Sequence, residues 1–293
     1  MKFLPGLSVL IQLLKDNELK KFIFSILLLI KVTGAWAFGG DSIQYPELNK
    51  TYIKSYWYDS KRLIVSPAKW RTRQWIELGI VAGAGVLAYT QDEKIQEYFV
   101  AHQSETADNL SKYIFEPYGR FAPVIIGGLY LGGRLVKDNR LAGTSLTAAK
   151  ALIISSVGTN IVKQLTHRHR PYQDDIPDHA NWDGPFSSYE YNSFPSGHST
   201  AAFSMATVYA LEYSSTIWVP VLSYTLAAGT AVSRLYDNKH WASDVVIGSA
   251  LGFVTGRFIW KQSRKGNNKV VILPSAGTHS ASVTCLIQIA DHK

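Results

Sequence analysis

Apolar residues gather in six long segments of the 293-residue chain, each bounded by charge, glycine or proline. The segments lie at about residues 76–90, 121–136, 141–165, 199–213, 217–234 and 244–260. They are longer than a typical strand, and apolar and polar positions do not alternate with a period of two, so helices are predicted. Prolines stand at or near the proposed boundaries, where helices tolerate them. The pattern predicts an all-α bundle of six helices.

Small residues recur in the first two of these segments. The glycines concerned are Gly79, Gly83, Gly85, Gly127, Gly128, Gly132 and Gly133. Small residues let neighbouring helices approach closely, as they do in membrane bundles. We therefore expect tight helix contacts at these positions.

The hydropathy of the segments fits a bilayer only marginally. A spanning helix needs about 20 mostly apolar residues, and several segments are shorter or carry a charge such as Glu77, Arg134 or Lys150. The mean hydropathy of −0.01 is low for a protein of this size with six spans. The pattern is compatible with a transmembrane bundle and with a peripheral one.

The two ends of the chain differ from the bundle. Residues 1–37 carry Lys20 and Lys21, an apolar run and Ala35-Trp36-Ala37, which favours a signal peptide, with an uncleaved anchor or an ordinary amphipathic helix as alternatives. Residues 38–75 are rich in tyrosine and tryptophan, which suits either an interfacial belt or packing against the bundle. The helical domain is expected over residues 76–262. Residues 263–293 read as a short β-hairpin tail.

Charge is unevenly distributed along the chain. Lys and Arg number 30 against 22 Asp and Glu, a net charge of +8, which is compatible with nucleic acid, an anionic membrane or an anionic substrate. Basic residues cluster at Lys61–Arg73 and again after Arg257, whereas residues 171–195 contain five acids and no Lys or Arg. This segregation suits orientation on a membrane, and no nucleic-acid-binding signature is present, so nucleic acid is not expected. The lone cysteine, Cys285, leaves no intramolecular disulfide.

Three polar clusters lie between Lys163 and Asp244, at the proposed helix ends. They are Lys163 with Arg170-Pro171, then Pro195-Ser196-Gly197-His198, then Ser233-Arg234 with His240 and Asp244. If the helices run alternately up and down, the ends of the third and fifth share a face with the starts of the fourth and sixth. All three clusters are then expected to meet at one end of the bundle.

Five residues of the clusters suit phosphate binding. Lys163, Arg170 and Arg234 supply fixed positive charge, and the arginine fork matches phosphate oxygens. Ser196 and the backbone N–H of Gly197 add donors at a helix N-terminus, where anions bind well.

Three further residues suit the chemistry of phosphoryl transfer. Asp244 follows His240 by four positions, so both are expected on one face of a helix start, with the carboxylate holding Nδ1–H and Nε2 free to attack phosphorus. His198 is suited to protonate the leaving oxygen. His167 and His169, although spaced like metal ligands, are predicted to be solvated loop residues. No carboxylate cluster suggests a required metal, so no cofactor is expected.

The three clusters resemble the signature of the type 2 phosphatidic acid phosphatase (PAP2) superfamily, which is shared with vanadium haloperoxidases and bacterial acid phosphatases. They read Lys163-x6-Arg170-Pro171, Pro195-Ser196-Gly197-His198 and Ser233-Arg234-x5-His240-x3-Asp244, with no departure from the family pattern. The resemblance covers about the third to the sixth helix. It implies a PAP2-type bundle and a metal-independent phosphatase that works through a phosphohistidine at His240. In the membrane members of the family the substrates are lipid or isoprenoid phosphates.

Other activities stay open at this point. A vanadium-dependent haloperoxidase would hold vanadate, bonded to His240, in the same pocket. A periplasmic acid phosphatase would act on soluble phosphomonoesters. A non-catalytic binding protein is a third alternative, although such a role would not need both histidines and Asp244.

The charge pattern also predicts an orientation. Basic residues at 61–73, 134–140 and 257–269 fall at the end of the bundle opposite to the clusters. By the positive-inside rule that end would face the cytoplasm. We therefore expect an exported bacterial-type protein in the cell membrane or periplasm, with its site on the periplasmic side. The expected partners are a lipid phosphate substrate and the membrane, without an obligate protein partner.

Overall fold

The computed structural model describes residues 44–185, 187–188, 190–264, 270–277 and 280–287. The expected signal peptide or anchor, residues 1–37, lies outside the described residues. Six long helices are present: α4 (Thr72–Tyr89), α8 (Ala122–Leu135), α9 (Asn139–Thr166), α10 (Gly197–Glu212), α11 (Trp218–Tyr236) and α12 (Ala242–Arg264). Each overlaps one of the six apolar segments. The helical fold class is therefore as predicted.

Six is nevertheless too low a number for the described part of the chain. Further elements are α3 (Lys50–Val65), the 3-10 helix η1 (Ser66–Lys69), α5 (Asp92–Ala101), α6 (Glu105–Leu110), the π-helix η2 (Ser111–Phe115) and α7 (Glu116–Arg120). Their sequences are polar, so no apolar run marks them. Side-chain caps mark the starts of two of them: the Asn49 side chain accepts from the N–H of Tyr52 at 2.9 Å at the start of α3, and Ser104 caps α6 in the same way.

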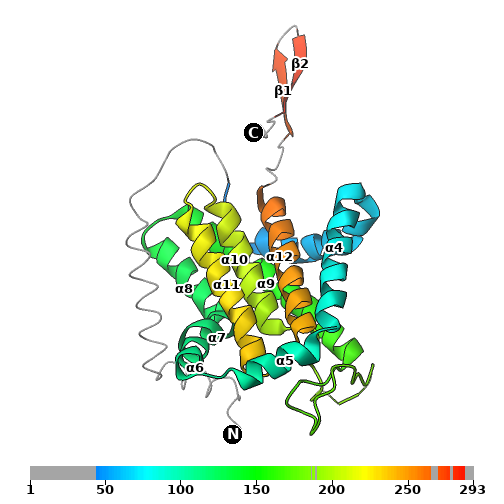
Figure 1. The fold of residues 1–293 in the computed structure, drawn as a ribbon. Helices are drawn as coiled ribbons and strands as arrows, with labels where there is room; N and C mark the ends of the chain where they lie inside the picture. Colours follow the sequence, from blue (N-terminus) through cyan, green and yellow to red (C-terminus); the bar gives the residue numbers. More distant parts are fainter. Residues whose placement is uncertain (1–43, 186, 189, 265–269, 278–279, 288–293) are drawn as a thin grey trace, which may run out of the picture.

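The centre of the bundle is built from small side chains on α9, α10 and α12. Ala148, Ala151, Ala202 and Ala206 are fully buried there. Figure 1 shows α9, α10 and α11 in the middle of the bundle, with α8 on one side and α12 and α4 on the other. Helices that follow one another along the chain from α8 to α12 run in opposite directions. The ends of α9 and α11 therefore lie at the same end of the bundle as the starts of α10 and α12.

A row of glycines sets the distance between α10 and α12. A Cβ at Gly248, Gly252 or Gly256 would lie closer than 3.0 Å to a backbone oxygen of α10 or its N-cap. These glycines are four residues apart, so they share one face of α12. The backbones of the two helices touch along this face, and the start of α12 is thereby fixed against the start of α10.

The close contacts expected at the glycines of α4 and α8 are only partly present. Among the described residues, a Cβ would meet nothing within 4 Å at Gly79, Gly83, Gly127 or Gly128. Gly85 does pack closely against Ile247 of α12, and Gly133 against the backbone of Ala142 in α9. The prediction was wrong for the first four because composition does not reveal which side of a helix meets a neighbour.

The aromatic segment before α4 both packs and faces outward. Tyr52 is buried, and its hydroxyl donates to the Leu146 carbonyl at 2.8 Å. Lys150 of α9 forms a buried ion pair with Asp59 of α3 at 2.8 Å. Trp57, by contrast, is exposed. Helix α3 is therefore anchored on α9 by its inner face alone.

Glu212 ties the far end of the bundle together. Its carboxylate accepts from Tyr45 Oη at 3.2 Å, Arg140 Nε at 3.0 Å and Trp260 Nε1 at 3.0 Å, and it pairs with Arg264. The segment before α3, the start of α9, the end of α10 and the end of α12 thus meet at one buried carboxylate.

Two strands follow the bundle. β1 (Val270–Gly277) and β2 (Ser280–Ile287) pair antiparallel, with Val270 opposite Ile287. They fall within the segment expected to form a hairpin tail. Helix α12 continues to Arg264, slightly beyond the expected domain end at 262.

Candidate active site

The three sequence clusters lie at the end of the bundle where α9 and α11 finish and α10 and α12 begin (Figure 1). Lys163 is in the last turn of α9, and Arg234 is in the last turn of α11. Ser196 is the N-cap of α10, and Asp244 is in the first turn of α12. The alternating direction of the four helices is what places these residues side by side.

A loop between α9 and α10 closes this end and engages the first two cations. Lys163 Nζ donates to the carbonyl oxygens of Asn192 and Ser193, the latter at 3.3 Å. Arg170 Nη2 donates to Asn192 Oδ1 at 2.7 Å. Both cations are therefore held against the same short stretch of the loop. That stretch leads directly into the N-terminus of α10.

His240 and Asp244 face each other, although not on one helix as expected. Helix α12 begins at Ala242, so His240 precedes it. The His240 Nδ1 lies 3.5 Å from Asp244 Oδ2 and 3.3 Å from Ser193 Oγ. Asp244 also reaches back to the N–H of Trp241 at 2.9 Å, as the third helical residue of a capping box does. With Nδ1 directed at these oxygens, Nε2 is on the opposite side of the ring.

The N-terminus of α10 faces the same space. The N–H of Ser196 donates to the Asp244 carbonyl at 3.0 Å, while the Ser196 side chain makes no capping hydrogen bond to the helix. The first N–H groups of a helix have no intrahelical acceptor and attract anions. A Cβ on Gly197 would lie 4.0 Å from the Lys163 side chain. Backbone donors and an ammonium group therefore converge here.

The short helix α7 forms a further wall that the sequence did not predict. A Cβ on Gly119 would lie 3.2 Å from the Cβ of His198, so α7 packs directly against this histidine. From the same helix Glu116 lies 3.9 Å from the Arg234 guanidinium, which also donates to Asp237 at 2.7 Å. Arg234 is thus held by two carboxylates, at 2.7 Å from Asp237 and 3.9 Å from Glu116.

Both site histidines are expected to be neutral in the unliganded protein. Burial is the main reason that the pKa of His240 falls to about 4; the bond to Asp244 opposes it, and the charge of Lys163 adds to it. Burial, followed by the charges of Arg234 and His240, lowers the pKa of His198 to about 3. These groups lie outside α9 and α12, the two helices among the described residues that are both long and apolar enough to cross a membrane. The neutral imidazole of His240 can act as a nucleophile. A bound anion would favour the protonated form of His198, which can then act as an acid.

The helices that carry this site match the model of a known protein family. The model of the PAP2 superfamily matches residues 144–268. Over this segment the chain is similar to the PAP2 superfamily. The segment spans most of α9, the loop that follows it, and α10, α11 and α12.

Two of the individual proteins reported as similar to the chain carry the name of a lipid phosphatase. The lipid A 1-phosphatase of Porphyromonas gingivalis is 50% identical over 66 residues, which are 22% of this chain and 15% of that protein. The match therefore spans only a small part of the relative's length. LpxE of Aquifex aeolicus is 17% identical with a TM-score of 0.45, over 58% of this chain and 94% of the other. A transmembrane PAP2-type phosphatidylglycerolphosphate phosphatase of Bacillus subtilis is 17% identical with a TM-score of 0.44, over 73% and 96%.

Two histidines of the PAP2 segment are buried, contrary to the prediction that they are solvated. His167 and His169 are only 1% and 7% exposed. The His169 ring lies between Asp174, 2.8 Å from Nδ1, and Asp183, 3.3 Å from Nε2, and it stacks on Tyr191 at 3.7 Å. Asp174 and Asp183, two of the acids of the loop, thus contact this ring from opposite sides. His169 therefore organises the loop that carries Arg170.

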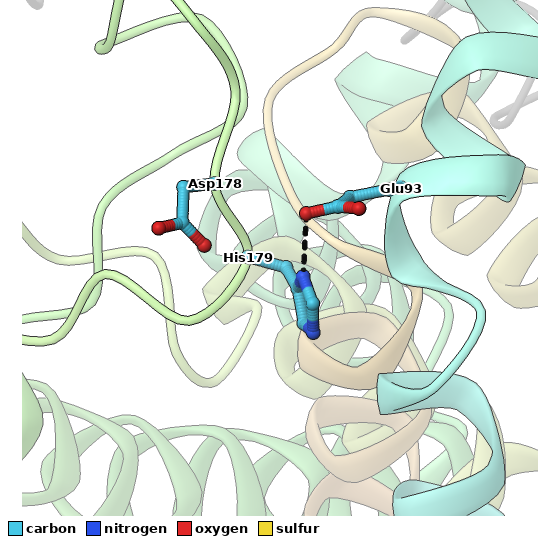
Figure 2. A group of neighbouring side chains, drawn as sticks. All are labelled: Glu93, Asp178 and His179. Carbon is cyan, nitrogen blue, oxygen red and sulfur yellow. Dashed lines mark hydrogen bonds and ion pairs between the residues drawn. The ribbon is translucent and has the colours of Figure 1, made fainter.

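One group outside the site has ligand atoms close enough for a metal ion. Glu93, Asp178 and His179 each offer an atom within 4.8 Å of the others. Figure 2 shows the His179 ring directed at Glu93, at 2.8 Å, and no contact from either to Asp178. Asp178 instead accepts from the N–H of Ala180 at 2.8 Å, within its own turn. The carboxylates of Glu93 and Asp178 are both exposed. The contact between Glu93 and His179 links α5 to the loop between α9 and α10, and this link explains the group.

Two buried residues beside the predicted site residues, Arg168 and Asp92, were not predicted from the sequence. Arg168 lies within the first cluster and donates to Asp244 at 2.6 Å. Asp92, in α5, pairs with Arg168 at 2.7 Å. The only available signal was the position of Arg168 between Lys163 and Arg170. Asp92 lies outside every cluster, and no spacing rule points to it.

Proposed function

We propose that the chain is a metal-independent phosphoric monoester hydrolase that removes phosphate from a lipid or isoprenoid phosphate through a phosphohistidine at His240. The observation that supports this best is the meeting of three cations, a helix N-terminus and two neutral imidazoles at one end of the bundle. Asp244 stands behind the imidazole that would attack. The PAP2 match over the same helices supports the same reaction.

The substrate phosphate would be held by charge and by backbone donors. Lys163 and Arg170 flank the loop at Asn192 and bring two positive charges. The first turn of α10 adds N–H groups, and Arg234 completes the set from the side of α7. Donors fixed in advance around a phosphoryl group stabilise the charge of its transition state without reorganising.

Transfer to the protein follows from the orientation of His240. Its Nε2 attacks phosphorus while the bond from phosphorus to the lipid oxygen breaks. His198 gives its proton to that oxygen, and Asp244 stabilises the positive charge on His240 by accepting from Nδ1–H. Water then attacks the phosphohistidine, its proton passes to His198, and inorganic phosphate leaves with His240 restored.

A lipid substrate is supported by the outer surface of the bundle. Helices α9 and α12 are long and apolar enough to cross a membrane by length and composition. On α9, Ile153, Val157 and Ile161 are about half exposed, at 49%, 54% and 56%. On α4, Ile80 and Val86 are still more exposed. Exposed large apolar side chains in this number on α9 and α4 favour contact with lipid over contact with water.

We further propose that the site faces the periplasm. The opposite end of the bundle carries Arg71 and Arg73 at the start of α4, Arg134 at the end of α8, and Lys261 and Arg264 at the end of α12. The positive-inside rule puts such an end in the cytoplasm.

The test of the function is phosphate release by the purified full chain from a panel of substrates. The panel holds a lipid A 1-phosphate, phosphatidic acid, phosphatidylglycerol phosphate, undecaprenyl pyrophosphate and a soluble monoester. Lipid A stands first because the Porphyromonas gingivalis relative carries that name. Release from a lipid is expected. Release from the soluble ester alone would contradict the lipid assignment, and halide oxidation without any release would contradict phosphatase function altogether.

Orthovanadate should inhibit release, whereas EDTA should leave it unchanged. Vanadate adopts the trigonal geometry of the transferring phosphoryl group, so a site built for that group binds it tightly. The cations described above come from the protein itself, so removal of divalent ions takes nothing from them. Initial rates are measured with each addition. Loss of activity in EDTA that returns with a divalent ion would contradict the mechanism.

The dependence on pH should differ between kcat/KM and kcat. In the free protein His240 loses its nucleophilic form only below its pKa of about 4, so the acid limb is expected near that pH. The pKa of His198 in the free protein is about 3, so His198 loses the proton that it must donate as pH rises above 3. We therefore expect kcat/KM to fall as pH rises. Bound phosphate raises the pKa of His198, so kcat should stay level to higher pH. An acid limb of kcat/KM between pH 6 and 7, after correction for substrate ionisation, would contradict the burial of His240.

A further inference from the structure

We propose that Arg168 is a positioning residue of this reaction: it fixes the Asp244 carboxylate so that His240 is presented in one orientation and one tautomer. This inference rests on the proposed function. Arg168 has no role in the three sequence clusters, and its side chain is fully buried.

Every N–H of the Arg168 guanidinium has an acceptor. Nη1 donates to Asp244 Oδ1 at 2.6 Å and to Ser243 Oγ at 2.7 Å. Nη2 donates to Asp92 Oδ2 at 2.7 Å and to the His179 carbonyl at 2.8 Å, and Nε donates to the same carbonyl at 3.0 Å. These five bonds use all the donors that an arginine has. The guanidinium plane can therefore occupy one orientation only.

The two oxygens of Asp244 are divided by this arrangement. Oδ1 is taken by Arg168. Oδ2 accepts from Ser193 and from the N–H of Trp241, and it is the oxygen 3.5 Å from His240 Nδ1. A carboxylate held at Oδ1 cannot rotate to withdraw Oδ2 from the imidazole. The hydrogen on Nδ1 is thereby retained, and Nε2 keeps the lone pair that attacks phosphorus.

Asp92 makes the same contact rigid from α5. Its Oδ1 accepts from the N–H of Ser243 at 2.8 Å, and its Oδ2 accepts from Ser243 Oγ at 2.6 Å. An N–H in the first turn of α12 is thus satisfied by a carboxylate from another helix. Arg168 lies between Asp92 and Asp244, both buried and both requiring its charge. Without the arginine, these two buried carboxylates would have no cation between them, which is strongly unfavourable.

Three aromatic rings and the contact between His179 and Glu93 keep water away from Arg168. The rings of Tyr89, Trp182 and Trp241 lie 5.1, 4.7 and 5.5 Å from its guanidinium carbon. Such faces attract a cation and exclude solvent. The carbonyl of His179 accepts two of the bonds from Arg168. The imidazole ring of His179 is bonded to Glu93, which holds this residue in place (Figure 2).

The test compares Arg168→Met and Arg168→Lys with Arg73→Met in the full chain. Arg73 is an exposed arginine whose side chain pairs only with Glu77 in the described residues, so its variant controls for loss of an arginine. We expect Arg168→Met to lower kcat by about 100-fold, as loss of a support for a reacting histidine does, with KM changed less than about threefold. Arg168→Lys should restore part of kcat, because the charge returns without the fork. Arg73→Met should match the wild type.

A double mutant separates positioning from mere stability. If Arg168 acts through Asp244, adding Arg168→Met to Asp244→Asn should lower kcat little further. An additive loss, or a rise in KM alone, would overturn the proposal. Should Arg168→Met fail to fold, the same comparison is made with Arg168→Lys.

A second readout does not depend on turnover. Nitrogen-15 NMR of the histidine rings in the free protein should report one Nδ1–H tautomer for His240 in the wild type and in Arg73→Met. The Arg168 variants should give a mixture of tautomers. An unchanged single tautomer would overturn the proposal. Wild-type protein without turnover would instead contradict the proposed function, and the NMR result would still decide the role of Arg168.

Discussion

Replacing His240 by alanine should lower phosphate release by about four orders of magnitude or more while leaving the bundle folded. Loss of the attacking atom in covalent catalysis has an effect of this size. The fold should survive because the partners of the imidazole keep other contacts. Asp244 retains Arg168 and the N–H of Trp241, and Ser193 still donates to Asp244.

The matched control is His102→Ala. His102 is exposed just after α5, where its Nδ1 lies 2.8 Å from the Tyr98 carbonyl, so the same change of residue type there should leave turnover intact. Rapid acid-free quenching with phosphate-labelled substrate should trap label on wild-type protein and none on His240→Ala. Turnover retained by the variant, or label trapped on a different residue, would refute the phosphohistidine.

Alanine at Gly252 should destabilise the protein by about 3 kcal/mol, whereas alanine at Gly79 should stabilise it by about 0.5–1 kcal/mol. At Gly252 a Cβ would press on the Thr200 carbonyl and approach the N–H of Ser204, both fixed backbone atoms of α10. At Gly79 it would meet nothing within 4 Å among the described residues. The same substitution is thus expected to act with opposite sign on α12 and α4.

Thermal and denaturant unfolding of both variants in the same detergent measures this difference. Because Gly252 lies one turn below Gly248, which touches Ser196, we also expect Gly252→Ala to lower turnover, through displacement of the start of α10. A stability of Gly252→Ala equal to that of the wild type would mean that α10 and α12 are not in backbone contact.

Long apolar segments made the main helices predictable. A run such as 141–165 is too long for a strand and lies within α9 (Asn139–Thr166). The polar helices α3, α5, α6 and α7 were missed because capping side chains and contacts with the bundle, rather than hydrophobic pattern, specify them. The direction in which glycines face depends on packing between helices, so close contacts are absent among the described residues at four of the seven glycines named from the sequence.

The meeting of the clusters at one end could be foreseen because helix directions alternate and the clusters stand at helix ends. Their supports could not. The bond from Arg168 to Asp244 joins residues 76 positions apart, and nothing in either local sequence marks it. The burial of His169 depends likewise on Asp174 and Asp183 turning inward. Roles for the clustered residues remain proposals that the variants above test.

The contact of Asp92 with the first turn of α12 bears on how the protein is made. It joins residues 151 positions apart, and a chain emerges from the ribosome with its N-terminal part first. Helix α5 is therefore synthesised before the first turn of α12, which it caps. Until that turn is made, the Asp92 carboxylate lacks the Ser243 N–H as a partner. A nascent chain that ends before Asp244 lacks the partner of Arg168 and the carboxylate behind His240. We therefore expect no activity toward phosphate esters until α12 has been synthesised and packs against the other helices.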